Sequence, residues 1–339
     1  MPAAHYHGIA VISEIGFAGR YLAGARTICI TGSNGKTTTT MLTYRILKEA
    51  GFNVALGGNV GDSFALKVAE REHDWYVLEI SSFQLDGMRE FRADIAVLMN
   101  ITPDHLDRYG FRMQSYIESK MRIVQNQTYN DFFIYSDDDL NISAELARRE
   151  LPMRLLPFTA KSDEGITPVS GHEHGPLQGA FAAGDDFIAA VGERRFAMPV
   201  GDLKIKGLPN VYDAMAATMA AMAAGVPDES LRSTLESING VEHRMEPAGE
   251  IDGVEYINDS KATNVDSTWY ALQAMTKPVV WIAGGTDKGN DYAALEEIVR
   301  RKVKTLVLLG NDTRKLKDYF GGIVPTVYDT DKLEDAMAM

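Results

Sequence analysis

Residues 31–37 read Thr31-Gly32-Ser33-Asn34-Gly35-Lys36-Thr37, and this stretch decides the fold. It follows a short β-branched run and precedes a stretch of helical character. A glycine-rich turn that leads from a strand into a helix points backbone amides at a place where phosphate can bind. We therefore predict a phosphate-binding loop at a strand-to-helix junction of an α/β fold.

Each residue type in this loop has a chemical role. Glycines let backbone amides turn inward around a phosphate group, Lys36 supplies a cation, and the Thr37 hydroxyl can ligate Mg²⁺. The usual motif has another glycine six positions before the lysine, where this chain has Ile30, so the loop is a shorter Gly-x-x-Gly-Lys-Thr form. The alternative interpretation is a glycine turn that joins strand and helix by chance.

Short β-branched runs alternate with helical stretches on both sides of the loop. Such alternation predicts a mainly parallel sheet covered by helices. We expect strands at Thr27–Thr31, Trp75–Ile80 and Ile95–Met99, and helices at Thr37–Ala50 and Met113–Gln127.

The chain changes character further on. Residues 157–201 predict a small antiparallel excursion or lobe with a strand at Phe187–Val191, and an alanine- and methionine-rich helix follows at Val211–Ala224. A second, smaller doubly wound α/β series is expected to open with a strand near Glu255. It continues with a helix from Val265, strands at Val279–Ala283 and Thr305–Leu309, helices at Ala293–Arg300 and Thr313–Tyr319, and a last helix within residues 331–339.

Composition bounds the function. The 339 residues are 45% apolar and 24% charged, which is typical of a soluble globular protein of about two domains. A net charge of -13 argues against nucleic-acid or anionic-membrane partners, and no apolar run reaches the ~20 residues of a membrane-spanning helix. We find no secretory signal and a single cysteine, Cys29, so we expect a cytoplasmic protein.

Candidate site residues stand near the carboxyl ends of the predicted strands. Thr37, Glu79 and His105 lie at or just past these ends, where open α/β sheets gather their ligands. A carboxylate, a hydroxyl and phosphate oxygens suit Mg²⁺, whereas histidine is an unusual ligand for so hard a cation. Without further context Lys120 would be a solvent-facing lysine, and Asp259 and Lys261 a capping aspartate and a surface lysine.

The shortened loop resembles that of the Mur ligases and their folylpolyglutamate synthetase relatives, and other stretches resemble the Mur ligase branch that adds D-glutamate. Residues 81–84 carry its Ser-Ser-Phe-Gln version of a metal-binding strand end, and residues 258–264 carry Asn-Asp-Ser-Lys-Ala-Thr-Asn. The remaining stretches are Asn100 to Tyr109, Lys120 fifteen residues after His105, Glu242 to Glu246 and Gly284 to Gly289.

The resemblance implies roles for particular residues. Catalytic roles fall on Lys36, Glu79, His105, Lys120 and Arg244. ATP is expected to bind Gly32, Ser33, Asn34, Gly35, Lys36, Thr37, Thr38, Asn210, Asp213, Arg244, Asp259 and Lys261. Two Mg²⁺ sites are expected from Thr37, Glu79, His105 and Lys120, the last as a carbamate. Substrate contacts are expected from Asn59, Ser81, Ser82, His105, Thr263 and Lys288.

The resemblance also implies an activity and a domain plan. The expected reaction joins D-glutamate to UDP-N-acetylmuramoyl-L-alanine through an acyl phosphate, at the expense of ATP, in a monomer. We expect a linker at residues 1–25 from an N-terminal UDP-binding domain that is missing here, a central ATP-binding domain at 26–241, and an incomplete C-terminal Rossmann-like domain at 242–339.

This chain departs from the family pattern at residues 206–213. The family usually has histidine where this chain has Pro209, and a second asparagine where it has Asp213. An aspartate can accept a hydrogen bond from the adenine amine but cannot donate to a ring nitrogen, so the choice of base is open. Two alternatives to the expected ligase are a nucleotide-binding module that does not ligate and another family ligase such as a folylpolyglutamate synthetase.

Overall fold

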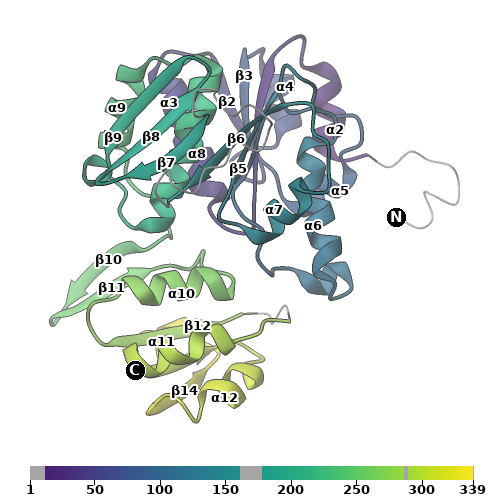
Figure 1. The fold of residues 1–339 in the computed structure, drawn as a ribbon. Coiled ribbons are helices and arrows are strands. Elements are labelled where there is room, and N and C mark those ends of the chain that lie inside the picture. Colours follow the sequence, from purple (N-terminus) through teal and green to yellow (C-terminus); the bar gives the residue numbers. More distant parts are fainter. Residues whose placement is uncertain (1–11, 161–177, 286–288, 339) are drawn as a thin grey trace, which may run out of the picture. The chain divides into compact units, whose positions relative to one another are not determined.

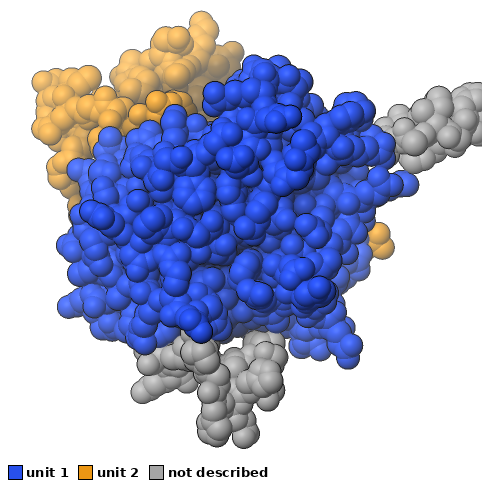
Figure 2. Space-filling model, turned by 90° about the horizontal axis from the view of Figure 1, so that it is seen from above, with its two compact units in different colours: residues 1–101, 114–241 blue, residues 102–113, 242–339 orange. Residues whose placement is uncertain are grey.

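The chain divides into two compact units in a computed structural model that describes residues 12–160, 178–285 and 289–338 (Figure 2). Residues 1–101 and 114–241 form the first unit, and residues 102–113 and 242–339 form the second. Each unit has its own apolar core, so each is described by itself.

The first unit is built on a nine-stranded sheet with the order β2-β3-β1-β4-β5-β6-β7-β8-β9 (Figure 1). Every pair from β2 to β7 is parallel, whereas β8 is antiparallel to β7 and β9. The predicted mainly parallel α/β sheet is therefore confirmed. The strands are β1 (Arg26–Thr31), β2 (Val54–Gly58), β3 (Trp75–Glu79), β4 (Ile95–Leu98), β5 (Phe132–Ser136), β6 (Arg154–Thr159), β7 (Gly179–Ala183), β8 (Asp186–Val191) and β9 (Arg194–Pro199).

Helices cover both faces of this sheet. Helices α3 (Lys36–Glu49), α8 (Leu208–Ala224) and α9 (Asp228–Ser237) lie on one face, where their apolar residues join the main core. The other face carries shorter helices in Figure 1: α2 (Glu14–Ala18), α4 (Phe64–Glu70), α5 (Ser82–Gly87), α6 (Met113–Met121) and α7 (Leu140–Leu146). Among the described helices, none is long and apolar enough to cross a membrane.

One prediction for the first unit needs correction. The helix expected to reach Gln127 ends at Met121 and is followed by a 3₁₀ turn, where Arg122 donates to Leu85 O and Met88 O at the end of α5, each at 2.8 Å. The predicted antiparallel excursion is confirmed, because β8 is antiparallel to β7 and β9, and it extends the main sheet because β7 pairs with β6.

The second unit contains a parallel sheet of β12 (Val279–Gly284), β13 (Val303–Leu309) and β14 (Thr326–Thr330). Its helices are α10 (Val265–Ala274), α11 (Glu296–Lys302), α12 (Arg314–Phe320) and α13 (Leu333–Ala338). The strand expected near Glu255 is β11 (Val254–Asn258), but it pairs with β10 (Glu246–Ile251) in a hairpin and does not join the sheet. Asp252 and Gly253, with φ of 50° and 80°, form the tight turn that such a hairpin requires.

Candidate active site

The predicted phosphate loop lies between β1 and α3, as the sequence indicates. Gly35 has φ 80° and comes directly before the first residue of the helix, Lys36. Asn100, which follows β4, the neighbour of β1 in the sheet, holds the loop. Its side-chain oxygen accepts from Asn34 N at 2.8 Å, and its carbonyl accepts from Ser33 N at 2.9 Å. Asn100 was only part of a longer motif in the sequence, so this supporting role was missed.

Two lysine ammonium groups meet at one carbonyl of the loop. Lys36 Nζ donates to Gly32 O and Ser33 O, both at 2.8 Å. Lys120 Nζ, on a different helix, donates to the same Gly32 O at 2.7 Å and to Thr31 Oγ1 at 3.1 Å. Lys120 is 2% exposed, so it is not a solvent-facing lysine. The structure thus brings two of the predicted catalytic lysines together at Gly32 O, while the carbamate on Lys120 stays a prediction.

Glu79 ends β3 on the same edge of the sheet as the loop. It pairs with Ile30 of β1 on one side and with Gly58 of β2 on the other. Asn59, which follows β2, donates its backbone N–H to Glu79 O at 2.8 Å and its side-chain amide to Glu79 Oε1 at 2.7 Å. Gly58 has φ 96°, and a side chain there would collide with Glu79 O. Predicted substrate residue Asn59 therefore orients the predicted metal ligand.

The second carboxylate oxygen of Glu79 is the feature that points to a cation. Glu79 is 2% exposed, and within the described residues no hydrogen-bond donor reaches its Oε2. A buried carboxylate oxygen is costly unless a donor or a metal ion contacts it. The described ranges contain no group of three or more His, Cys, Asp or Glu residues that could hold a metal by themselves. A metal here would depend on Glu79, Thr37 and oxygens of the ligand, which is a set that Mg²⁺ accepts.

Two predicted substrate residues have local structural partners. Ser81 is the N-cap of α5: its Oγ accepts from Gln84 N at 3.3 Å, and Gln84 returns the bond in a capping box. Ser82 is buried, and its carbonyl accepts from Ser119 Oγ at 3.0 Å. Their contacts with a substrate stay predictions.

The two residues predicted to bind the adenine base differ in exposure. Asn210 is near the start of α8, and its side-chain amide donates to Lys206 O at 2.7 Å. Asp213 is 4% exposed and accepts from Thr39 Oγ1 at 3.0 Å, so its carboxylate faces α3. Neither observation tests a contact with a nucleotide, and both assignments stay predictions.

In the second unit, backbone strain surrounds Arg244. His243 and Met245 have φ of 63° and 46°, a left-handed conformation that costs free energy for residues other than glycine. The Nε of Arg244 is buried, and the described residues supply no hydrogen-bond partner for it. Met245 N donates to Asp259 Oδ1 at 3.1 Å. The residue directly after Arg244 is therefore hydrogen-bonded to Asp259, another predicted ATP-binding position.

The electrostatics of Asp259 reflect its surroundings. Burial raises the pKa of its carboxyl group above the ordinary aspartate value, although the hydrogen bond from Met245 and the charge of Arg244 oppose the shift.

Lys261 N donates to His243 O at 3.2 Å, and the side chains of Lys261 and Thr263 are exposed. Lys288 lies outside the described residues. His105 precedes a 3₁₀ turn at Leu106–Tyr109, has φ 53°, and its Nε2 is 3.6 Å from Asp104 Oδ2.

An open cleft of about 1000 Å³ lies at the carboxyl ends of β12 and β13 in the second unit. Arg314 and Lys315 at the start of α12 contribute cations to it. The Arg314 guanidinium pairs with Asp312, with two N–O distances of 3.0 Å, and Lys315 Nζ donates to Asn290 O at 2.7 Å. The lining also contains Asp318, so the cleft is polar and its two cations are matched by the carboxylates of Asp312 and Asp318.

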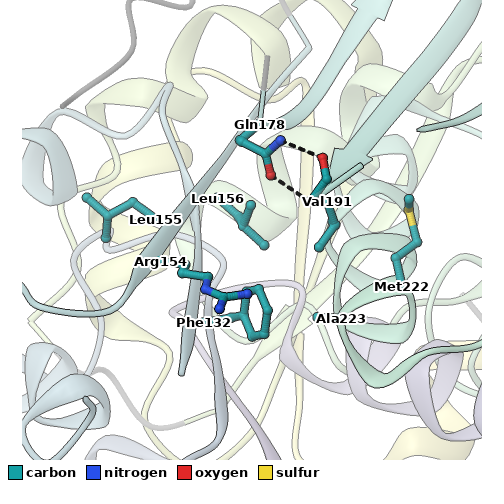
Figure 3. A pocket seen from close by; sticks show the side chains of 9 residues that line it. Phe132, Arg154, Leu155, Leu156, Gln178, Val191, Met222 and Ala223 are labelled. Carbon is teal, nitrogen blue, oxygen red and sulfur yellow. Dashed lines mark hydrogen bonds between the residues drawn. The ribbon is translucent and has the colours of Figure 1, made fainter. Parts of the chain in front are cut away.

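The first unit has a smaller hollow of about 320 Å³ that contains none of the predicted site residues (Figure 3). It lies where β5 and β6 begin, on the edge of the sheet opposite the phosphate loop. The Arg154 guanidinium stacks 5.1 Å from the Phe132 ring centroid, and the Gln178 amide is bonded to the backbone of Gly192. The walls of this hollow are mostly apolar, and the Gln178 amide is already hydrogen-bonded to Gly192. The hollow therefore offers no catalytic group.

Comparison with known proteins gives consistent matches. The model of the Mur ligase middle domain matches residues 30–221, and that of the Mur ligase glutamate ligase domain matches residues 243–339. A UDP-N-acetylmuramoylalanine–D-glutamate ligase of Bacteroides fragilis is 52% identical over 314 residues, which are 92% of this chain and 67% of that protein. The Porphyromonas gingivalis ligase of the same name is 46% identical over 98% of this chain and 71% of its own length.

Solved structures share the fold at low sequence identity. MurF from Acinetobacter baumannii has a TM-score of 0.66 at 18% identity and covers 96% of this chain and 79% of its own. FolC from E. coli, solved in complex with ADP, has a TM-score of 0.68 at 16% identity and covers 99% of this chain and 89% of its own.

Proposed function

The chain belongs to the Mur ligase family, and we propose that it is an ATP-dependent ligase that joins D-glutamate to UDP-N-acetylmuramoyl-L-alanine. The 52% identity to a ligase of that name supports this choice of substrates over those of other family members. Within the structure, the observation that carries the proposal is the buried Glu79 Oε2 beside a phosphate loop, since that pair suits a Mg²⁺-nucleotide.

Mur ligases use ATP and Mg²⁺, and we assign their binding groups in the first unit. Glu79 and Thr37 would hold a Mg²⁺ ion, which neutralises the charge that develops on the phosphate oxygens. Lys36 would move from the carbonyls of Gly32 and Ser33 to the terminal phosphate. Asn59 would keep Glu79 Oε1 occupied and so direct Oε2 to the metal. His105, which belongs to residues 102–113 of the second unit, and a carbamylated Lys120 stay predicted ligands of a second Mg²⁺ ion.

The proposed reaction has two steps. An oxygen of the alanine carboxylate attacks the terminal phosphorus of ATP, the bond to ADP breaks, and an acyl phosphate forms. The neutral amine of D-glutamate then attacks the acyl carbon, phosphate leaves with its bridging oxygen, and the nitrogen loses a proton to give the amide. Such chemistry depends mainly on positioning and on charge neutralisation, which the cations and the metal ligand at the loop would supply.

We assign the amino acid to the second unit. The family model that matches residues 243–339 is described as a glutamate ligase domain, and this unit has a polar cleft with cations at Arg314 and Lys315 and carboxylates at Asp312 and Asp318. An amino acid suits such a cleft because its carboxylate and ammonium groups can each meet a group of opposite charge. Thr263 and Lys288 are further proposed contacts. By the same reasoning we assign residues 26–241 to nucleotide binding and residues 242–339 to amino-acid ligation.

The decisive experiment measures ATP binding by calorimetry with Mg²⁺, and phosphate release with both substrates, for the wild type and Lys36→Ala. Lys48→Ala is the matched control, because Lys48 is an exposed lysine at the other end of α3. We expect Lys36→Ala alone to abolish binding and turnover, and D-glutamate alone among amino acids to stimulate phosphate release.

Each alternative function has its own outcome in this experiment. Lys36-dependent binding without turnover would favour a nucleotide-binding module that does not ligate. Turnover stimulated by another amino acid would favour another ligase of the family. Binding that survives Lys36→Ala would contradict the assignment of the loop.

A further inference from the structure

The carboxylate of Asp213 contacts the back of the phosphate loop. Asp213 is in the second turn of α8, which packs beside α3, and is almost fully buried. Its Oδ1 accepts a hydrogen bond from Thr39 Oγ1 at 3.0 Å. Thr39 itself is in the first turn of α3, and its backbone N–H donates to Gly35 O at 2.9 Å. Asp213 is therefore connected through one residue to the loop glycine.

The same oxygen also lies directly against Gly35. A Cβ atom placed on Gly35 would be 2.5 Å from Asp213 Oδ1, closer than real Cβ contacts allow. Gly35 adopts φ 80°, the left-handed conformation that turns the chain into α3 and places Lys36 at its start. The carboxylate thus fills the space behind the residue whose conformation sets the direction of the loop.

We propose that Asp213 positions the phosphate loop and does not read the nucleotide base. Oδ1 of Asp213 is engaged by Thr39 and lies against Gly35, so this carboxylate oxygen supports the loop and is not presented to a base edge. The inference rests on the proposed nucleotide site. It also removes the reason to expect a changed base preference from an aspartate at this position, because the side chain acts on the loop and not on the base.

The charge of Asp213 fits this role. Its carboxylate lies at the N-terminal turn of α3, where the helix dipole favours a negative group. Asparagine would keep an acceptor for Thr39 but lose the charge, whereas alanine would lose the acceptor and leave a gap behind Gly35. These two substitutions therefore separate geometry from charge.

The test measures the Kd of Mg²⁺ complexes of ATP, GTP and inorganic tripolyphosphate for the full chain and four variants. Asp213→Ala and Thr39→Val should weaken all three ligands by the same factor, about tenfold, because each removes a buried hydrogen bond that supports the loop. Asp213→Asn and Thr39→Ser, which keep the bond, should stay within about threefold of the wild type. The ratio of ATP to GTP affinity should not change in any variant.

A different pattern would overturn the inference. If Asp213→Asn changed the ATP to GTP ratio, or if Asp213→Ala left tripolyphosphate binding intact, Asp213 would act on the base. A second measurement needs no nucleotide: melting temperatures of Gly35→Ala, Asp213→Ala and the double variant form a cycle that reports their contact. We expect Gly35→Ala to cost less in the Asp213→Ala background, and equal costs would contradict the contact.

The two tests also separate this inference from the proposed function. A wild-type chain that binds no nucleotide while the melting cycle shows coupling would refute the ligase site and leave the contact in place. A chain that binds ATP through Lys36 without coupling would refute only the positioning role.

Discussion

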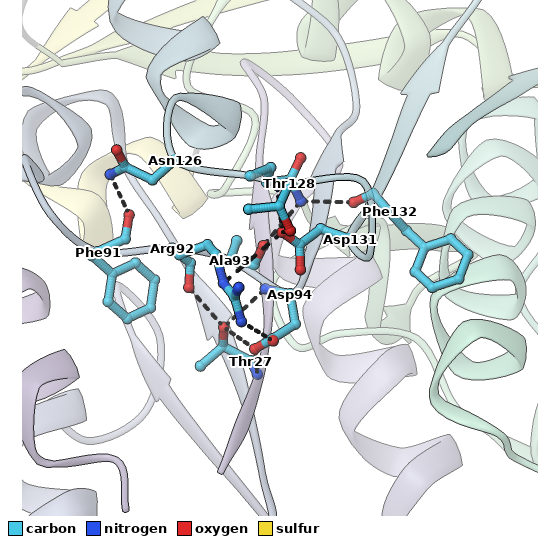
Figure 4. A network of polar contacts seen from close by, with 10 residues as sticks. Thr27, Phe91, Arg92, Ala93, Asp94, Asn126, Thr128, Asp131 and Phe132 are labelled. Atoms are coloured by element: carbon cyan, nitrogen blue, oxygen red, sulfur yellow. Dashed lines mark hydrogen bonds and ion pairs between the residues drawn. The ribbon is translucent and has the colours of Figure 1, made fainter. Parts of the chain in front are cut away.

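Strand β1 carries differently arranged polar groups at its two ends, Thr27 and Thr31, which are ~13 Å apart along the strand. At Thr27 the groups satisfy one another: Asp94 Oδ2 accepts from Thr27 N at 2.8 Å, and Asp94 Oδ1 accepts from Arg92 at 3.1 Å (Figure 4). At Thr31 the ammonium groups of Lys36 and Lys120 both donate to Gly32 O, and the carboxylate of Glu79, on the neighbouring strand β3, keeps Oε2 without a hydrogen-bond donor among the described residues.

The comparison separates stability from function within one sheet. The Thr27 end adds Asp131, which accepts from Thr128 N at 2.6 Å and lies 3.9 Å from Arg92 Nε, so the carboxylates of Asp94 and Asp131 both contact donors of the protein (Figure 4). At the Thr31 end, the buried Glu79 carboxylate keeps Oε2 without a hydrogen-bond donor among the described residues. A carboxylate oxygen of this kind suits a ligand that brings a metal ion together with its phosphates.

The largest effect should come from Glu79→Gln. Glutamine keeps the oxygen that Asn59 contacts but replaces Oε2 by an amide that cannot ligate Mg²⁺, so we expect turnover to fall about 10³-fold, roughly 4 kcal/mol of transition-state stabilisation. Phosphate release measured over a Mg²⁺ titration tests this. Glu72→Gln, an exposed glutamate before the same strand, is the control. A Glu79→Gln enzyme with the Mg²⁺ dependence of the wild type would show that Oε2 binds no metal.

Asp94→Ala should give a smaller effect of a different kind. It removes the acceptor for Thr27 N and the partner of Arg92, and the buried groups left behind should cost about 2–3 kcal/mol in the free energy of unfolding. Nucleotide affinity should not change, because the loop is at the other end of β1. Urea unfolding and ATP calorimetry on the same variant test both statements, with Asp94→Asn as the milder control. A loss of ATP affinity at unchanged stability would show that Asp94 serves nucleotide binding and not the stability of the fold.

The sequence predicted the Thr31 end better than the Thr27 end. The loop and Glu79 belong to short motifs whose residue types and spacing are constrained by chemistry, so local patterns were sufficient. The role of Lys120 was predicted only through the family resemblance, because a lone lysine on a helix would ordinarily face solvent. The Thr27 network joins segments about 65 residues apart, and nothing in the local sequence indicates that Asp94 would face Thr27. The same limit explains why the sequence predicted a role for Asp213 at the base but not its contact with Thr39, 174 residues earlier.

Secondary structure was predictable to a similar degree. The strands and helices that flank the loop follow from β-branched runs and helical periodicity. The end of α6 at Met121 and the pairing of β11 with β10 depend on partners outside the local sequence. The Asp252-Gly253 dipeptide is a local sequence signal for the β10–β11 hairpin.

The smallest effect should come from Asp259, a carboxylate whose burial is only partly compensated. Burial raises its pKa against the opposing influence of Met245 N and Arg244, so the folded state binds the proton more tightly than the unfolded state does. The stability that Asp259 contributes is therefore present below the ordinary aspartate pKa of about 3.9 and is lost as the pH rises through the raised folded value.

Asp259→Asn should consequently gain stability relative to the wild type as the pH increases from 4 to 7, because the amide avoids the cost of a buried charge. Urea unfolding followed by tryptophan fluorescence measures this difference, since Trp269 and Trp281 both report on the second unit. Taking the difference between the two proteins at each pH cancels the titration of other groups. A stability difference that shrank toward pH 7 would mean that the folded pKa of Asp259 is lowered, and the hydrogen bond from Met245 N and the charge of Arg244 would then outweigh burial.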